Sequence, residues 1–279
     1  MKKKVYFKLR KAFVLGSLMV AGALGALSGY AQQTVTVTYG SETDAPAATF
    51  IAPAGVESAS VKVWGAGGSG GVTTATGQQR GGGGAGAYSF VDGFSLTSGL
   101  SYSLSVGAAG IDGAAGGDSY FEAIVSEGGK STTTDTGGTG GVFSSNHDGQ
   151  NGGNGGNGDP DTGIADRWRQ GGKGGDSPNG GSGGSGASQN KDFNLPTSAG
   201  AAGFPGGGGG GGVFAGGRQV AQSNGANGRV TVAFSAPTPT IIAVNNITDI
   251  LTNQQPVLRV VNPLSPLSEN DPTKNITYT

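Results

Sequence analysis

A stretch of extreme glycine density, from Gly65 to Gly217, constrains this chain more than any other feature. It holds 51 of the 59 glycines in the 279-residue sequence, including seven consecutive glycines at 206–212. Glycine has no side chain to bury and loses more backbone freedom on folding than any other residue. A conventional hydrophobic core therefore cannot organise this stretch. Either it is a flexible linker, or its backbone packs and hydrogen-bonds with itself.

The glycine runs repeat with a period of three residues, as in GGNGGNG at 152–158 and GGSGGSG at 180–186. Three residues per turn is the period of an extended three-fold helix. Without side chains, several such helices can approach closely and exchange N–H···O=C bonds. Collagen is excluded, because a strict Gly-X-Y repeat rich in proline is absent. Strand-like segments lie on both sides of the runs, which favours packed polyglycine II-type helices over a flexible linker.

Segments in which apolar and polar side chains alternate flank and interrupt the glycine runs. This alternation is typical of strands with one buried face, and no segment has the period of an amphipathic helix. We therefore predict an all-β fold, a short-stranded and sandwich-like β-frame that encloses the polyglycine helices and long glycine loops. Ser60–Trp64 and Arg229–Phe234 share the same alternation, so we expect them to be neighbours in one sheet. The predicted strands are 34–39, 48–52, 60–64, 87–91, 101–106, 119–125, 229–234, 241–244 and 256–261.

The N-terminus has the pattern of a secretory signal peptide. Six basic residues among the first 11 precede an apolar run, 12–27, and the small residues Gly29 and Ala31 stand at the −3 and −1 positions of a cleavage site. A membrane anchor is the weaker alternative, because this run is shorter than the roughly 20 residues of a spanning helix and contains glycine. We expect a secreted or cell-surface protein.

We predict five consecutive parts along the chain, separated by changes in composition. They are a signal peptide at 1–31, a lead-in with one strand at 32–47, a glycine-rich β domain at 48–235, a Pro/Thr linker at 236–240, and the start of a further β-module or tail at 241–279.

Charge and composition exclude several classes of function. Without the leader the chain has 11 basic and 18 acidic residues, a net charge of −7 that does not attract nucleic acid or anionic lipid. The absence of cysteine excludes disulfides and thiolate chemistry. Gly65–Gly70 has the spacing of a dinucleotide fingerprint, but no helical pattern follows it. We predict no cofactor, no metal, no nucleic-acid partner and no membrane span after cleavage.

The candidate ligand-binding residues lie between Asn146 and Gln170. His147 is the only histidine of the chain, and nothing around it specifies a catalytic triad or a zinc site. In Arg167-Trp168-Arg169, a Trp between two arginines can stack on sugar or aromatic faces, and such residues are favoured at interfaces. Alternatively, Trp168 covers the glycine segments as a lid. We predict His147, Arg167, Trp168 and Arg169 as ligand-binding residues and no catalytic residue.

An ordered series of motifs is similar to a known family. Val61-Lys-Val-Trp-Gly-Ala-Gly-Gly68, Gly116-Gly-Asp-Ser-Tyr-Phe121 and Asn224-Gly-Ala-Asn-Gly-Arg-Val-Thr-Val232 resemble the glycine-rich domain of exported and phage tail-tip proteins. The resemblance covers roughly 48–235. It implies a β-frame around packed polyglycine helices that serves surface recognition, and it transfers no catalytic residue.

These observations predict a non-enzymatic surface or extracellular protein that acts in binding or adhesion, with a cell-surface glycan or protein as its partner. One alternative is a passive spacer within a larger cell-surface protein. A second is a secreted glycan-active enzyme, which would require two carboxylates that converge in a cleft.

The leader gives a first testable prediction. We expect cleavage after Ala31, so that the exported protein begins at Gln32. Intact-mass analysis of the exported protein tests this, and a retained N-terminus would contradict the prediction of secretion.

Overall fold

We describe a computed structural model that covers residues 33–75, 77–159, 169–189, 196–215, 218–236 and 275–278. The chain divides into two units, one of Thr34–Ser235 with Asn262–Thr279 and one of Met1–Gln33 with Ala236–Val261. In the second unit only Gln33 and Ala236 are described, and the Ala236 N–H donates to the Gln33 carbonyl at 2.7 Å. The predicted signal peptide and the predicted strands 241–244 and 256–261 lie outside the described residues.

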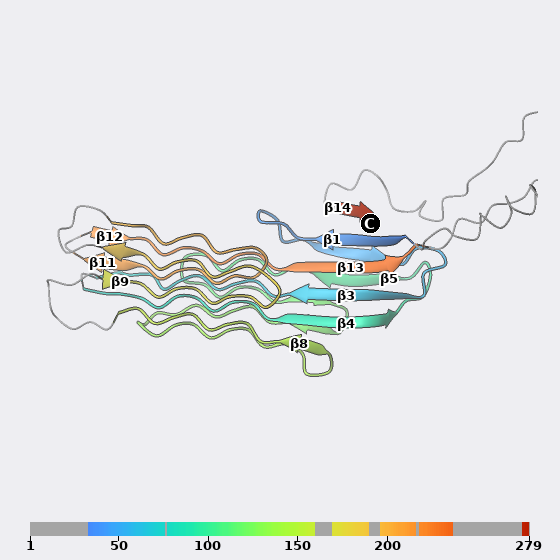
Figure 1. Ribbon diagram of the computed structural model, residues 1–279, viewed down its shortest axis with the longest axis horizontal. Helices are drawn as coiled ribbons and strands as arrows, with labels where there is room; N and C mark the ends of the chain where they lie inside the picture. Colours follow the sequence, from blue (N-terminus) through green and yellow to red (C-terminus); the bar gives the residue numbers. More distant parts are fainter. Residues whose placement is uncertain are drawn as a thin grey trace, which may run out of the picture. The chain divides into compact units, whose positions relative to one another are not determined.

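The described part of the chain is all-β, with small antiparallel sheets and no helix. No helix there is long and apolar enough to cross a membrane. The largest sheet has six strands (Figure 1). In sheet order these are β14 (Asn275–Tyr278), β1 (Thr34–Tyr39), β13 (Arg229–Ser235), β3 (Ser58–Trp64), β4 (Tyr88–Ser95) and β8 (Asp148–Gln150).

Pairing of β13 with β3 confirms the predicted adjacency of these two segments. Val230 lies opposite Val63, and Val232 lies opposite Val61. All four valines are fully buried, because the alternation of both strands places them on the same face of the sheet.

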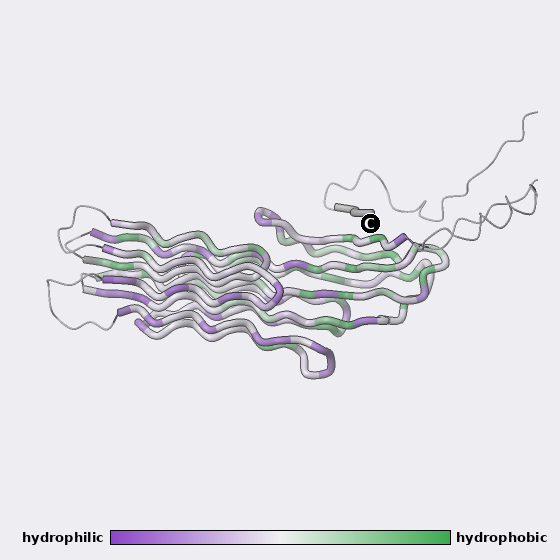
Figure 2. Tube along the Cα trace, viewed as in Figure 1, coloured by the Kyte–Doolittle hydropathy of each residue, from purple (hydrophilic) through white to green (hydrophobic). Residues whose placement is uncertain are grey.

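A second sheet has four strands, in the order β2 (Ala47–Ile51), β5 (Ser101–Ser105), β6 (Ser119–Phe121) and β7 (Ile124–Ser126). Phe50 of this sheet contacts Phe234 of the six-stranded sheet, with ring centroids 6.0 Å apart. The buried Ser126 hydroxyl also donates to the Val63 carbonyl of β3 at 2.9 Å. The two sheets therefore share one core, and Figure 2 shows hydrophobic residues concentrated along their strands.

The segment 119–125, predicted as one strand, is instead a tight hairpin of β6 and β7. Phe121 pairs with Ile124, and Glu122 adopts a left-handed backbone conformation with φ of 50°. The Glu122 carboxylate holds this turn against β5, because it accepts hydrogen bonds from the backbone N–H and the hydroxyl of Ser103.

Two further two-stranded sheets lie at the other end of the glycine runs (Figure 1). One pairs β9 (Arg169–Gln170) with β10 (Ser188–Gln189), and the other pairs β11 (Val213–Ala215) with β12 (Arg218–Val220). None of these four short strands was predicted from the sequence, because two or three residues carry too little alternation to be recognised.

Between the two ends, glycine-rich segments run side by side and hydrogen-bond directly to one another, and we call this region the glycine bundle. Its segments are 65–72, 80–87, 107–117, 127–134, 137–141, 152–158, 171–177, 181–187, 200–212 and 221–228. In segment 65–72, every third N–H donates to the same neighbour. Gly65, Gly68 and Gly71 donate to the carbonyls of Ala87, Gly84 and Gly81, at 2.9–3.0 Å.

Segment 80–87 lies at the centre of the glycine bundle. Its N–H groups point in three directions in turn, since Gly83 donates to Gly209, Gly84 to Lys130 and Ala85 to Gly153. Its carbonyls accept hydrogen bonds from three further segments, and the donor segment again changes with each successive residue. The segments bonded to it are 65–71, 127–134, 137–141, 153–156, 172–175 and 206–212.

The close approach of these backbones leaves no room for side chains. A Cβ atom added to Gly210 would overlap the Ser185 carbonyl, and one added to Gly67 would overlap the Gly207 carbonyl. Where a run meets solvent, every third residue carries a side chain, such as Lys173 and Asp176 in GGKGGDS. The three-residue period in the sequence therefore marks the outward direction of each segment.

Asparagine side chains at this spacing satisfy backbone groups at the outer edge of the bundle. The Oδ1 atoms of Asn154 and Asn157 accept hydrogen bonds from the N–H groups of Gly140 and Gly137, each at 2.9 Å. These N–H groups face outward and would otherwise rely on water. The GGNGGN repeat thus completes the hydrogen bonding of a neighbouring segment.

Adjacent glycines in this repeat give a matched test of the packing. A Cβ on Gly155 would overlap the Gly82 carbonyl, whereas one on Gly156 would lie 3.4 Å from Lys173, an ordinary contact. We expect Gly155→Ala to lower the free energy of unfolding by about 1–3 kcal/mol through overpacking. Gly156→Ala is expected to be neutral or stabilising by up to about 1 kcal/mol, because alanine restricts the unfolded chain. Denaturant unfolding measures both changes, and equal effects would contradict close packing.

Candidate functional site

The end of the glycine bundle away from the two large sheets brings together segments from four parts of the chain, and we call it the distal end (Figure 1). It comprises residues 72–75 and 77–79 with the short strands β9, β10, β11 and β12. An isolated bridge joins Gln79 to Val213, and the Gln219 side chain donates to the Thr73 carbonyl at 2.8 Å. Chain reversals distant in sequence are therefore held together here.

A small hydrophobic cluster of Ala187, Val213 and Val220 stabilises the distal end. Arg169 lies beside it in β9 and is half-buried. Its Nη1 donates to the Gly77 carbonyl at 2.8 Å, which ties β9 to the 72–79 loop. The Arg169 side chain thus positions the loop around Gly77 and also carries a positive charge at the distal end.

Buried polar atoms without a hydrogen-bond partner among the described residues also occur at the distal end. They are the Thr73 hydroxyl and both amide atoms of Gln189, whose side chain is 2% exposed. Such groups are costly, and native proteins keep few of them.

His147 lies elsewhere, at an open pocket of about 380 Å³ beside the β4–β8 edge of the six-stranded sheet. Phe90, Asp92, Asn146 and Asp148 also line this pocket. Because β8 pairs with β4, with Asp148 opposite Phe90, the turn that contains His147 lies against an exposed edge of the sheet.

The structure does not bring His147 and Arg169 together. The strands next to them, β8 and β9, lie at opposite ends of segment 152–158 (Figure 1). Arg167 and Trp168 lie outside the described residues, so their ligand-binding roles stay predictions. Phe90 and Asp92 were not predicted as neighbours of His147. Asp92 lies beyond the predicted strand 87–91, and only the pairing of β4 with β8 connects these residues with His147.

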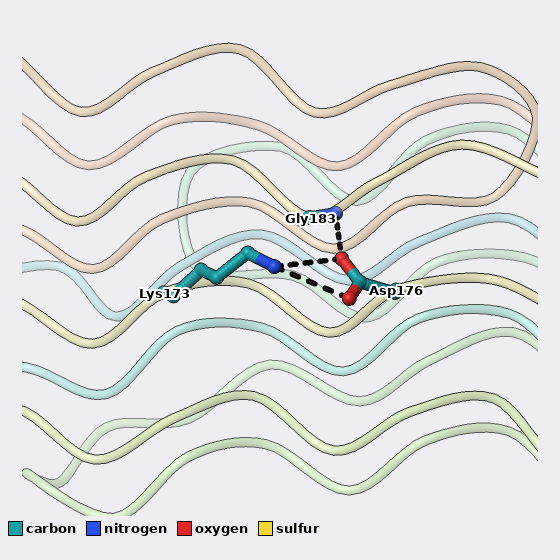
Figure 3. Close-up of polar contacts among 3 residues, drawn as sticks. All are labelled: Lys173, Asp176 and Gly183. Atoms are coloured by element: carbon teal, nitrogen blue, oxygen red, sulfur yellow. Dashed lines mark hydrogen bonds and ion pairs between the residues drawn. The ribbon is translucent and has the colours of Figure 1, made fainter.

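Several of the described carboxylates accept backbone hydrogen bonds along the glycine bundle or next to it. Asp118 accepts a hydrogen bond from the Gly128 N–H at 2.8 Å, and Asp159 accepts one from the Gln170 N–H at 3.2 Å. Asp176 accepts one from the Gly183 N–H at 2.7 Å and pairs with Lys173 Nζ at 2.9 Å (Figure 3). No group of three or more acidic or histidine side chains within the described ranges is arranged to hold a metal ion.

The glycine segments described above lie in the part of the chain that matches a known family. The model of the glycine-rich domain matches residues 42–235, well over half of the chain. The chain belongs to this glycine-rich domain family. A comparison with curated proteins gives no match. The resemblance to a glycine-rich domain is therefore confirmed, whereas its exported or phage tail-tip context stays a prediction.

Asp176 gives a pH-dependent prediction for this glycine-rich domain. The hydrogen bond from Gly183, followed by the one from Lys173, lowers the Asp176 pKa below its usual value. A lowered folded-state pKa stabilises the fold above the unfolded pKa, and this contribution is lost as the pH falls through the folded pKa. We expect Asp176→Asn to cost less than about 1 kcal/mol at neutral pH, since the pair is exposed, and nothing in strong acid. Thermal melting across this pH range measures the difference.

Lys173→Gln separates the two causes of the lowered pKa. It removes the ion pair but keeps the Gly183 hydrogen bond. At neutral pH it should therefore lower the stability less than Asp176→Asn does. A pH-independent loss in Asp176→Asn would contradict the role of ionisation.

Proposed function

We propose that this chain is an exported, non-catalytic surface or extracellular protein that acts in binding or adhesion. The observation that carries the proposal is the distal end, where segments from four parts of the chain are paired on a backbone-bonded scaffold. Binding residues are disproportionately found on loops that a rigid scaffold positions. The leader at 1–31 supports secretion or display at the cell surface.

The scaffold consists, in this proposal, of polyglycine II-type helices enclosed at one end by a β-sandwich. The hydrogen bonds that recur at every third residue support the first part, because this is the period of a three-fold helix. The Phe50–Phe234 contact between the two large sheets supports the second. Such a bundle is stiff, since each segment is hydrogen-bonded to its neighbours along its length.

The proposed recognition residues are Arg169 at the distal end, Arg167 and Trp168, which precede it in the sequence, and His147 at a separate place. The Arg169 side chain is held at this end by its hydrogen bond to the Gly77 carbonyl. Trp and Arg are the residues most enriched in binding hot spots. The proposed partner is a cell-surface glycan or protein, and we propose no cofactor.

A single substitution tests this proposal. Trp168→Ala is expected to weaken attachment by about 2 kcal/mol or more, roughly thirtyfold, with an unchanged melting temperature. Attachment is measured with purified protein on a glycan array and on a panel of whole cells. Arg218→Ala, an exposed arginine of β12 at the same end, is the matched control and should have little effect.

Arg169→Ala should in contrast lower the melting temperature, because it removes the hydrogen bond to Gly77. If Trp168→Ala binds normally but melts earlier, Trp168 is a lid over the glycine bundle. If the unaltered protein attaches to nothing on either panel, the passive-spacer alternative replaces the proposal.

A further inference from the structure

The pocket beside β4 and β8 is built from two segments that the fold brings together. Alternation along β4 places Phe90 and Asp92 on the outer face of the six-stranded sheet, and both line the pocket. The turn that leads into β8 supplies Asn146 and His147, and it is closed by the His147 N–H, which donates to the Ser144 carbonyl at 3.3 Å. Pairing of Phe90 with Asp148 holds the two sides in register.

The lining combines one aromatic ring with many hydrogen-bonding groups. Phe90 is half-buried, so part of its ring faces solvent, and the exposed Lys62 reaches over it with Nζ 5.9 Å from the centroid. Asp92, Asn146 and Asp148 are exposed, and the Asp92 carboxylate accepts a hydrogen bond from the Ser60 hydroxyl. The volume of about 380 Å³ falls within the range of small-molecule sites, about 300–1,000 Å³.

This chemistry selects among classes of ligand. An apolar ligand would need a mostly apolar lining, which this pocket lacks. Phosphorylated or otherwise anionic ligands would be repelled by Asp92 and Asp148, since these two carboxylates outweigh the single cation Lys62 beside Phe90. A saccharide has one apolar face for an aromatic ring and several hydroxyls for carboxylate, amide and imidazole groups.

We propose that this pocket binds a neutral saccharide unit, with Phe90 as the stacking surface and Asp92, Asn146, His147 and Asp148 as hydrogen-bonding partners of its hydroxyls. The inference rests on the proposed binding function but assigns a site separate from the distal end. It also gives His147 a role that does not depend on Arg167, Trp168 or Arg169.

The test titrates the exported protein with glucose, galactose, mannose and N-acetylglucosamine and follows the NMR signals of the protein. Glucuronate is titrated as the acidic counterpart of glucose. At least one neutral sugar should bind with saturable shifts, and glucuronate should bind more weakly than glucose. Phe90→Ala should weaken binding of the neutral sugar roughly five- to tenfold through loss of stacking. Phe90→Leu, which retains an apolar side chain and is less disruptive to β4, should show a similar loss.

Tyr120→Ala is the matched control, since Tyr120 is an exposed aromatic residue of the other sheet and should not affect binding. Asp92→Asn combined with Asp148→Asn should raise the affinity for glucuronate relative to glucose, a change that a purely structural role of these residues would not produce. Absence of binding by all four neutral sugars, or equal binding by both Phe90 variants and the unaltered protein, would overturn the proposal. Trp168→Ala should leave this titration unchanged, so a failure here is distinguishable from a failure of distal-end attachment.

Discussion

The backbone hydrogen bond between glycine segments is the interaction on which the rest of this structure depends. In an ordinary domain such bonds join strands into sheets, and side chains build the core between them. Here segment 80–87 is bonded on all sides to other segments, so backbone fills the space that side chains would occupy. The arrangement requires glycine at positions such as Gly67 and Gly210, where a Cβ would overlap a neighbouring carbonyl. It also holds the bundle together without disulfides and without the hydrophobic side chains that fill the core between the two large sheets.

A backbone core has consequences for where side chains can act. Along the bundle they appear at every third residue of the outer segments, and there they serve neighbouring segments. Asn154 accepts a hydrogen bond from Gly140, and Asp176 accepts one from Gly183 and pairs with Lys173. The two candidate sites therefore lie at the two ends. One is at the distal end around Arg169, and the other is the pocket beside Phe90 and His147. The bundle itself acts as the scaffold between them.

Much of the fold follows from local sequence patterns. The incorrect or missing predictions concern features that leave no local pattern in the sequence. The alternation in Ser60–Trp64 and Arg229–Phe234 was enough to pair β3 with β13, because both expose one apolar face. The hairpin at Glu122 was missed, since a residue with positive φ and no glycine leaves no mark on the alternation of 119–125. His147 was recognised as a candidate by its chemistry alone. Its neighbours Phe90 and Asp92 lie more than fifty positions away in the sequence, and nothing local connects them with it.

By itself, the sequence determined that this chain would form short strands around glycine segments with a three-residue period, because alternation and glycine content act on each segment separately. Only the tertiary structure decided which glycine segments are neighbours. Glycine runs are nearly identical to one another and carry no side chains that could select a partner. Their order is set instead by the strands that lead into them and by the residues at every third position. For the same reason only the fold distinguishes Gly155, which faces the Gly82 carbonyl, from the adjacent Gly156, which faces outward.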